Sequence, residues 1–440
     1  MCSAQSVSYA NTNPLMLLSG CGAVMRDEKG RAYLDTRNNV AHVGHAHPAV
    51  ARAVATQVHT LNTNTRYLHP NVCALARKLV ETMPAGSELR ETGVVFFVNS
   101  GSEANDLALR LCAAYTKRRG VVVVDGAYHG HTKSVAGISP YKYAYLGGKP
   151  DAVEAVPTPD VYRGSASAES ARRDTAAAAR KLREDGRGVS AFFVESGMSV
   201  AGVVMAPEGW MRAAFETVRG AGGLCVADEV QTAMGRTGRW WYAFEAHGVF
   251  PDLVTLGKPL GNGMPLAAVV VVGRCADEFA KGPEYFNTFG GNPVCCAAGL
   301  SVFDVLKAER LRNNATAVGN HLVRRLRAIG EDASLDRVTV GDVRGIGLFL
   351  GADLVTDRTT KTPATRYASL LCSALVQRHN ILTSLDGPGD NVIVIKPPMC
   401  FSIRDADRFL DALHTELRRL NVLPPPILGK NNNVATRTPT

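Results

Sequence analysis

The chain has 440 residues, of which 46% are hydrophobic and 20% charged, and its formal net charge is +9. This length and composition exclude a small binding module and a disordered, collagen-like or coiled-coil chain, and they favour an enzyme. The basic residues are scattered, with no run longer than Lys117-Arg118-Arg119, so the positive charge favours a small anionic substrate over nucleic acid.

The ten cysteines are spread from Cys2 to Cys400 without a Cys-x-x-Cys pair, which indicates reduced thiols and not a disulfide framework. No apolar run approaches the roughly 20 residues that cross a bilayer, so we predict no membrane partner. The first residues also lack a basic patch followed by an apolar core. We expect a cytoplasmic protein, and a mitochondrial location stays open.

Taken in chain order, the first predicted element is a hairpin, with a turn at 27–30 and a strand at 32–35. Short apolar runs then alternate with helical patterns up to about residue 310, which predicts an α/β fold with a mostly parallel sheet covered on both faces. Ligands of such sheets bind at the carboxyl ends of the strands. The predicted strands are 94–98, 121–124, 191–194, 224–227 and 266–272.

The later part of the chain predicts a second, smaller α+β domain. A helical pattern covers 302–329, a strand is expected at 344–354, and a second helix at 364–378. We therefore predict an N-terminal segment (1–45) that joins the small domain, a large domain (46–310), the C-terminal small domain (311–425) and a flexible polar tail (426–440).

A predicted anion site follows the strand at 94–98. Asn99-Ser100-Gly101-Ser102-Glu103-Ala104-Asn105 has a Gly-Ser turn that opens a helix. The free N–H groups of a first helical turn and the helix dipole attract a phosphate, and the hydroxyls of Ser100 and Ser102 add donors. The segment is not a Walker loop, and no Gly-x-Gly-x-x-Gly follows a strand, which weakens a nicotinamide-dehydrogenase interpretation and favours a different phosphate-bearing cofactor.

Two further strand ends carry Asp228 and, thirty residues later, Lys258. This pair suits pyridoxal 5′-phosphate (PLP), because an ionised carboxylate keeps the pyridine nitrogen protonated and a lysine amine holds the aldehyde. Gln231 is placed to donate to the ring hydroxyl. Alone, each residue is more often a turn cap or a solvated charge, and only the combination with the anion site is specific.

Aromatic and histidine residues at another strand end add to this pattern. Tyr128 is expected to stack on a planar ring. His129 and His131 form a poor zinc site without a third ligand, and the same holds for the cluster His42, His45 and His47, so we predict no metal centre.

Together the motifs resemble the class-III PLP-dependent aminotransferases over about residues 13–420. The resemblance is carried, in order and spacing, by Asn99–Asn105, Asp228-Glu229-Val230-Gln231, Gly257-Lys258-Pro259 and Asn287-Thr288-Phe289-Gly290-Gly291-Asn292-Pro293. It implies a PLP-dependent transferase of fold type I, with a large PLP-binding domain, a small domain built from both chain ends, and a homodimer with active sites at the interface.

The resemblance also implies roles for individual residues. Lys258 holds PLP covalently, and Asp228 pairs with the ring nitrogen. Thr288 reaches the phosphate of the neighbouring subunit's cofactor. The remaining predicted cofactor contacts are Ser100, Gly101, Ser102, Tyr128, His129, Glu195 and Gln231.

A narrower resemblance points to the phospho-lyase branch, whose enzymes act on ethanolamine phosphate or 5-phosphohydroxylysine. Many aminotransferases have an arginine shortly before the Pro-Pro sequence, whereas this chain has Lys396. A lysine lacks the two-point fork that grips a planar carboxylate, so the change suggests a site that no longer binds an α-keto acid. The other resembling segments are 39–45, 61–69, 106–111, 138–142 and 395–401.

The expected reaction is therefore elimination of phosphate from a phosphorylated primary amine, with phosphoethanolamine as the first candidate substrate. The candidate cations for the substrate phosphate are Arg66, Lys396 and Arg37, and Glu195 is expected to pair with Lys396. Three alternatives remain open: elimination from 5-phosphohydroxylysine, transamination of an ω-amine or amino acid, and a cofactor-binding protein that has lost activity.

Overall fold

The computed structural model describes residues 14–143 and 146–422. The predicted tail at 426–440 and the first part of the predicted N-terminal segment lie outside these ranges. In the described part of the chain, no helix combines the length and the apolar character needed to cross a membrane.

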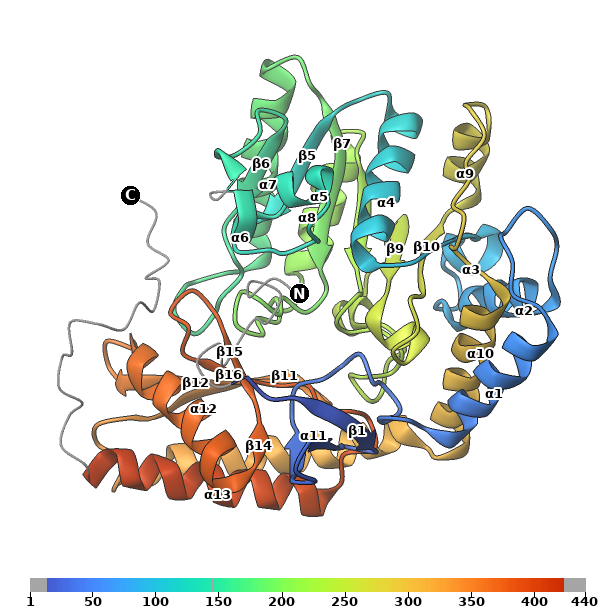
Figure 1. The fold of residues 1–440 in the computed structure, drawn as a ribbon. Helices are drawn as coiled ribbons and strands as arrows, with labels where there is room; N and C mark the ends of the chain where they lie inside the picture. The colour runs from blue at the N-terminus through green and yellow to red at the C-terminus, as the bar shows by residue number, and fades with distance from the viewer. Residues whose placement is uncertain (1–13, 144–145, 423–440) are drawn as a thin grey trace.

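A seven-stranded sheet forms the centre of the upper part of the molecule in Figure 1. The strands from β9 to β6 are parallel, and β10 runs antiparallel to both of its neighbours, β4 and β9. Every residue of β5, β7, β8, β9 and β10 is buried, as expected for strands covered on both faces. In spatial order the strands are β4 (Val94–Val98), β10 (Ala267–Val271), β9 (Leu253–Leu256), β8 (Leu224–Asp228), β7 (Val189–Glu195), β5 (Gly120–Val124) and β6 (Val153–Val156).

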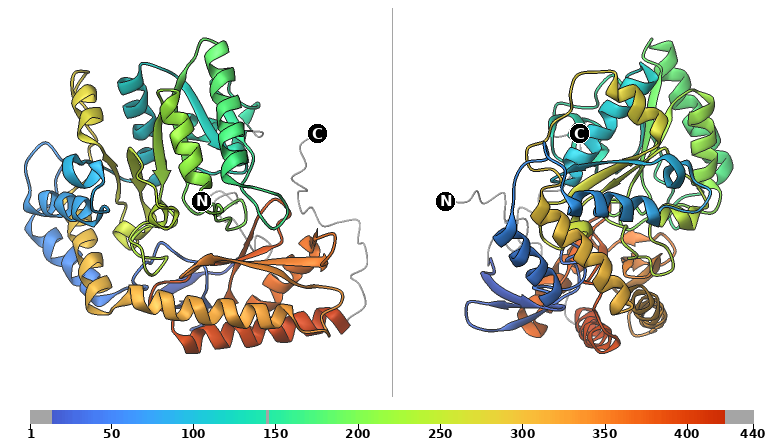
Figure 2. Two further views of the ribbon diagram at one scale, coloured as in Figure 1. Left: turned by 180° about the vertical axis from the view of Figure 1, so that it is seen from behind. Right: turned by 90° about the vertical axis from the view of Figure 1, so that its right-hand side faces the viewer.

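Helices cover both faces of this sheet. α7 and α8 pack together on one side, and α4 with α9 packs on the other, as the right-hand view of Figure 2 shows. The helices of this part are α3 (Glu88–Thr92), α4 (Gly101–Thr116), α5 (Lys133–Gly137), α6 (Pro140–Tyr143), α7 (Ala168–Glu184), α8 (Trp210–Gly220) and α9 (Gly273–Ala280), with the 3-10 turns η3 (Ala243–His247) and η4 (Lys258–Gly261). The prediction of a mostly parallel, doubly covered sheet is confirmed.

Two smaller sheets form the lower part. Strand β3 pairs in parallel with β14, so the two ends of the chain meet in one sheet. The long helices α11 and α13 run side by side beneath the strands (Figure 1). The sheets consist of β1 (Leu17–Cys21), β2 (Val24–Asp27), β3 (Ala32–Asp35) and β14 (Ile381–Leu382), and of β11 (Thr339–Ile346), β12 (Phe349–Asp357), β16 (Val392–Ile395), β15 (Ser384–Asp386) and β13 (Thr362–Pro363).

The remaining helices flank or support these layers. Helices α1 and α2 pack against α10 at the side of the large sheet, and α12 packs against α13. Their bounds are α1 (Pro48–Thr60), α2 (Pro70–Thr82), α10 (Pro293–Ala308), α11 (Leu311–Gly330), α12 (Thr365–His379) and α13 (Ile403–Val422). The domain limits drawn from the sequence remain a prediction.

Two predicted elements of the second half are wrong in detail. The helix expected at 302–329 is two helices, because Arg310 adopts a positive φ of 53° between α10 and α11. The strand expected at 344–354 is the hairpin β11–β12, which turns at Gly347 with a φ of 59°. The predicted turn at 27–30 and the helix at 364–378 are confirmed.

Candidate active site

The carboxyl ends of the parallel strands bring the two predicted catalytic residues to one edge of the sheet. Asp228 is the last residue of β8, and Lys258 follows β9 after a single glycine. Lys258 has a φ of +22°, which is strained for a side chain of its size and typical of functional positions. Burial lowers the pKa of its amine, and the carboxylates of Asp228 and Glu195 oppose this shift. The lysine is therefore poised closer to the neutral, nucleophilic form.

Three donors hold the carboxylate of Asp228. Its Oδ2 accepts hydrogen bonds from His129 Nδ1 and Asn105 Nδ2, each at 2.8 Å, and its Oδ1 accepts the Val230 N–H at 3.0 Å. The side chain of Asp228 is buried. Hydrogen bonds to the ionised form favour that form, so Asp228 is suited to face a cationic partner.

The start of α4 has the predicted anion-binding geometry. Ser100 caps the helix through its oxygen, which accepts the Glu103 N–H at 3.2 Å, while Glu103 accepts the Ser100 N–H. In the described chain, no acceptor lies on the N–H groups of Gly101 and Ser102. A Cβ on Gly101 would lie 2.8 Å from the side chain of Val230, so only glycine fits this turn. These free donors fit the phosphate of PLP.

The other cofactor contacts predicted at this edge lie on the loop after β5. The Tyr128 N–H donates to Glu195 Oε1 at 3.0 Å, which ties this loop to the end of β7. The Tyr128 ring is half-buried and packs edge-on against Tyr141, with the centroids 6.2 Å apart. His129 is buried, and its Nε2 has no hydrogen-bond partner among the described residues. The buried, unpartnered nitrogen and the donors of α4 fit a bound heterocyclic phosphate such as PLP.

Glu195 does not pair with Lys396, which corrects the sequence-based expectation. Its two oxygens accept backbone N–H groups, from Tyr128 and from Ser199 at 3.1 Å. Burial raises the pKa of Glu195 to about 7. Sequence gives the position of this glutamate but not the direction of its side chain, and the nearest donors are main-chain groups.

Lys396 instead enters a different hydrogen-bond network. Its Nζ donates to Ser199 Oγ at 2.6 Å and lies 3.5 Å from Gln231 Oε1. The same Gln231 oxygen accepts from Asn39 Nδ2 at 2.5 Å, which leaves the Gln231 amide nitrogen available to a ligand. Burial lowers the pKa of Lys396 to about 8, and the carboxylate of Asp386 opposes this shift.

Of the other two candidate substrate cations, only Arg37 is near this cluster. Its charge acts on Lys258, Lys396 and Asp386. Arg66 is exposed, pairs with Glu284 at 3.2 Å and lies over the Phe286 ring at 4.2 Å. In this subunit, therefore, Arg66 is held at the surface by its own neighbours.

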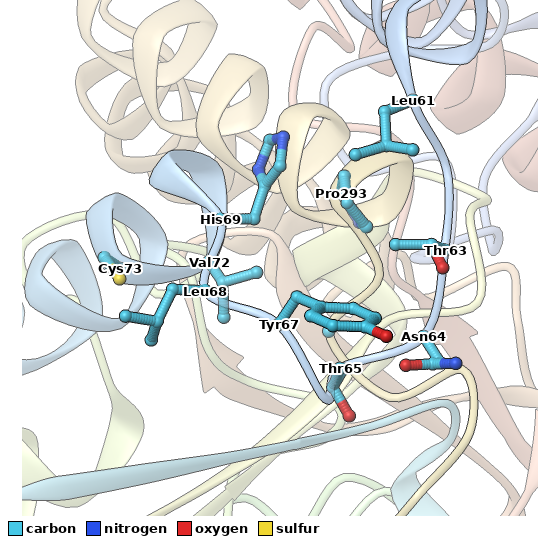
Figure 3. A pocket seen from close by; sticks show the side chains of 11 residues that line it. Leu61, Thr63, Asn64, Thr65, Tyr67, Leu68, His69, Val72, Cys73 and Pro293 are labelled. Carbon is cyan, nitrogen blue, oxygen red and sulfur yellow. The ribbon is translucent and has the colours of Figure 1, made fainter.

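Thr288 is also exposed, on the loop between α9 and α10. Asn287 anchors this loop near the start of α4, because its Oδ1 accepts from Asn99 Nδ2 at 3.1 Å. The segment 61–73 forms an apolar hollow with the start of α10, and Figure 3 shows Tyr67 beside Pro293 in its wall. Neither Arg66 nor Thr288 joins the Lys258 cluster within this chain.

The histidines of 42–47 have separate partners. His42 lies against the Met234 carbonyl and Arg236, His45 pairs with Asp35 at 2.7 Å, and His47 pairs with Glu309 at 2.9 Å. Within residues 14–143 and 146–422, no three side chains of metal-ligating type are grouped to hold an ion.

Sequence reasoning missed four polar side chains of this site. Asn105 was part of the quoted motif, and its spacing of four residues from Gly101 on one helix face was a usable signal. The other three sit on loops or strands distant in sequence, and no local pattern marks them: Asn39, Ser199 and Asp386.

Known proteins resemble the chain over nearly its whole length. The family model described as aminotransferase class-III matches residues 5–417. A Drosophila melanogaster protein named alanine–glyoxylate aminotransferase 2-like is 45% identical over 91% of this chain and 82% of the relative. A Caenorhabditis elegans protein named ethanolamine-phosphate phospho-lyase homolog 1 is 38% identical over 94% of this chain and 90% of the relative.

A solved structure of a phospholyase from Arthrobacter, in complex with phosphoethanolamine, superposes with a TM-score of 0.86. It is 39% identical, and the match covers 93% of this chain and 95% of that structure.

Proposed function

Because the chain belongs to the class-III aminotransferase family, whose enzymes depend on PLP, we propose that it is a phospho-lyase acting on a phosphorylated primary amine. Phosphoethanolamine is the lead substrate. Its elimination and hydrolysis consume one water and yield acetaldehyde, ammonia and inorganic phosphate. No keto acid enters this reaction.

The observation that carries the proposal is the state of Lys396. This residue stands where many family members have a substrate-binding arginine, and its ammonium group is buried and engaged by Ser199. A compact ammonium is a poorer receptor for a planar carboxylate than a guanidinium fork, but it is well suited to a phosphate. The likeness to the Arthrobacter phospholyase and the C. elegans relative points in the same direction.

Lys258, Asp228 and Gln231 provide the groups that the reaction requires. PLP, when bound, acts as an electron sink for the carbon that carries the substrate amine. The side chain of Asp228 accepts three hydrogen bonds and would face the ring nitrogen. The Lys258 amine would hold PLP and, as a free amine, would accept the proton from the substrate carbon that carries nitrogen. Gln231, whose Oε1 accepts from Asn39 Nδ2, would donate its amide N–H to the ring oxygen.

Phosphate departs from the adjacent carbon. The electron pair left by the proton forms the new carbon–carbon double bond, and the pair of the breaking carbon–oxygen bond leaves with the phosphate. The released ethenylamine is hydrolysed to acetaldehyde and ammonia. We propose Lys396 and Arg37 as the cations that stabilise the departing phosphate, since their charges lie around Lys258.

We also propose a homodimer that completes each active site. Three apolar side chains around the 61–73 hollow are exposed in the single chain: Tyr67 by 73%, Leu68 by 96% and Phe289 by 67%. Thr288 and Arg66 lie on the same surface and have no role in the Lys258 cluster of their own subunit. A second copy covering this surface buries the apolar residues and brings Thr288 to the neighbouring cofactor phosphate.

The test is an assay with purified enzyme, PLP and phosphoethanolamine, but no keto acid. Phosphate, ammonia and acetaldehyde are expected in equal amounts. A parallel reaction with 5-phosphohydroxylysine distinguishes the second phosphorylated candidate. Turnover that depends strictly on pyruvate, glyoxylate or 2-oxoglutarate refutes the phospho-lyase proposal.

An aminotransferase is the second candidate function, because the Drosophila relative carries an alanine–glyoxylate aminotransferase name. The assay with alanine and glyoxylate in place of phosphoethanolamine tests it directly. A protein that binds PLP but turns over none of these compounds would instead be a binding protein without lyase activity.

For the compartment we propose the cytoplasm. The cysteines of the described residues are free thiols, and two of them, Cys21 and Cys73, are exposed, which suits a reducing environment. Fractionation of cells that produce the tagged chain tests this, and recovery in the mitochondrial matrix would refute it.

A further inference from the structure

Asn105, a buried polar residue in the second turn of α4, connects three parts of the active site. Its amide nitrogen donates one hydrogen bond to Asp228 Oδ2 and one to the His129 carbonyl, both at 2.8 Å. Through the first bond it holds the carboxylate at the end of β8. Through the second it fixes the loop that carries Tyr128, and it does so from the helix whose start forms the proposed phosphate site.

The distribution of donors on Asp228 is asymmetric. Asn105 and His129 both donate to Oδ2, whereas Oδ1 accepts only the Val230 N–H. Because His129 donates through Nδ1, its neutral form leaves Nε2 as an acceptor, and this atom is buried without a partner in the described chain. The amide of Asn105 therefore adds to the stabilisation of the carboxylate without adding a positive charge that would compete with a cationic ligand.

Burying the amide of Asn105 costs folding free energy, and packing alone does not explain why this position is polar. The Asn105 Oδ1 atom is also buried and has no partner among the described residues. A leucine has the same number and branching of side-chain heavy atoms and would avoid both this unsatisfied oxygen and the desolvation of the amide. The neighbouring inward positions of α4 are apolar, namely Ala104, Leu107, Ala108 and Leu111.

We propose that Asn105 is a positioning residue that keeps the shared proton on the cofactor ring nitrogen and away from Asp228. A hydrogen-bond donor lowers the proton affinity of the carboxylate that accepts it. With two such donors on Oδ2, the proton between Asp228 and the pyridine stays on nitrogen, and the ring keeps its capacity to accept electrons. The inference rests on the PLP site of the proposed function and is independent of which amine is the substrate.

The test uses holoenzyme reconstituted with PLP that carries ¹⁵N in the ring. The first variant is Asn105→Leu, which removes both hydrogen bonds of the amide but keeps the branched shape of the side chain, and the second is Asn105→Ala, which cannot introduce a clash. Thr116→Val is the matched control, because it removes the hydrogen bonds of a half-buried side chain near the far end of α4. Thermal unfolding of each apoprotein reports its folding separately.

In the wild type and in Thr116→Val we expect the ring nitrogen resonance of a protonated pyridine. In the Asn105 variants it moves toward the value of the neutral ring, and the affinity for PLP falls roughly tenfold to a hundredfold, as for the loss of one hydrogen bond to a charged group. A purely structural role would lower the unfolding temperature without moving the nitrogen resonance.

Variants that bind PLP with the wild-type nitrogen resonance overturn the inference, and so do two variants that are both unfolded as apoproteins, since the residue then serves stability alone. A wild-type protein that takes up no labelled PLP refutes the cofactor assignment itself. If the wild type releases no phosphate from phosphoethanolamine but the nitrogen resonance still moves in the Asn105 variants as expected, the proposed substrate is refuted and the role of Asn105 stands.

Discussion

Replacing Lys396 with methionine should stabilise the protein while it impairs the reaction. Burial lowers the pKa of Lys396 from 10.5 to about 8. At about 1.4 kcal/mol per pKa unit, the charged lysine costs the folded state about 3 kcal/mol below pH 8. The variant also loses the hydrogen bond to Ser199 Oγ, which offsets about 1–2 kcal/mol of the stabilisation gained by removing the buried charge. A methionine of similar length should therefore raise the free energy of unfolding by about 1–2 kcal/mol at pH 7.

The pH dependence gives the sign of this effect. Between pH 8 and 10.5 the unfolded lysine keeps its proton while the folded one has lost it, so wild-type stability rises with pH across this window. The advantage of Lys396→Met is therefore largest below pH 8 and disappears toward pH 10.5. In the wild type, kcat/KM for phosphoethanolamine should fall about tenfold per pH unit above pH 8, as the charge that faces the phosphate is lost.

Two measurements check this reasoning. The unfolding temperature of the Lys396→Met apoprotein should be about 1–2 °C higher than that of the wild type, given the unfolding entropy of a chain of this length. Phosphate release by Lys396→Met should be about 10- to 100-fold slower at pH 7 and should lack the alkaline decrease. Lys29, which is exposed and has no side-chain ion pair among the described residues, provides the control, Lys29→Met, which should change neither quantity. A Lys396→Met protein that is less stable at pH 7, or that keeps the wild-type kcat/KM, contradicts the assigned role.

Three further predictions concern other residues. Lys258→Ala should abolish the visible absorbance of bound PLP and reduce turnover at least about 10⁴-fold, because one group both binds PLP and moves the proton; an active variant would show that the lysine is misassigned. Burial raises the pKa of Glu195 to about 7, so stability should fall as pH rises from 4.5 to 7, and Glu195→Gln should reduce this dependence in pH-resolved unfolding; an unchanged profile would contradict a buried charge. Leu68→Arg should yield an inactive monomer in light-scattering and activity measurements, whereas an active dimer would place the interface elsewhere.

Sequence alone could predict those site residues that follow a strand or open a helix. Asp228 and Lys258 each follow an apolar run, and the parallel arrangement of the strands then requires that they meet at one edge. Gly101 and Ser102 follow the same logic at the start of α4. For these residues, local pattern and topology determine the position together.

The residues that sequence could not place depend on side-chain direction across long separations. Lys396 and Ser199 are 197 positions apart, and the packing of the loop after β7 against the β15–β16 region brings their side chains to 2.6 Å. The expected partner of Lys396 was wrong. The carboxylate of Glu195, at the end of β7, has the opposite charge, but its two oxygens already accept backbone N–H groups. Charge complementarity identifies candidate partners, but the choice among them depends on geometry.

The buried charges of the site are consistent with the proposed phosphorylated substrate. Lys396 is desolvated, and the neighbouring positive charges of Arg236 and Arg37 lower its pKa further. Asp386 lies in the same cluster, and burial raises its pKa, so it is a weak source of compensating negative charge. A phosphate dianion would deliver two negative charges to this position and relieve the repulsion between Lys396 and the neighbouring arginines, whereas a neutral amine would not. The same burial that makes Lys396 costly to the free protein thus makes its attraction for a phosphate strong.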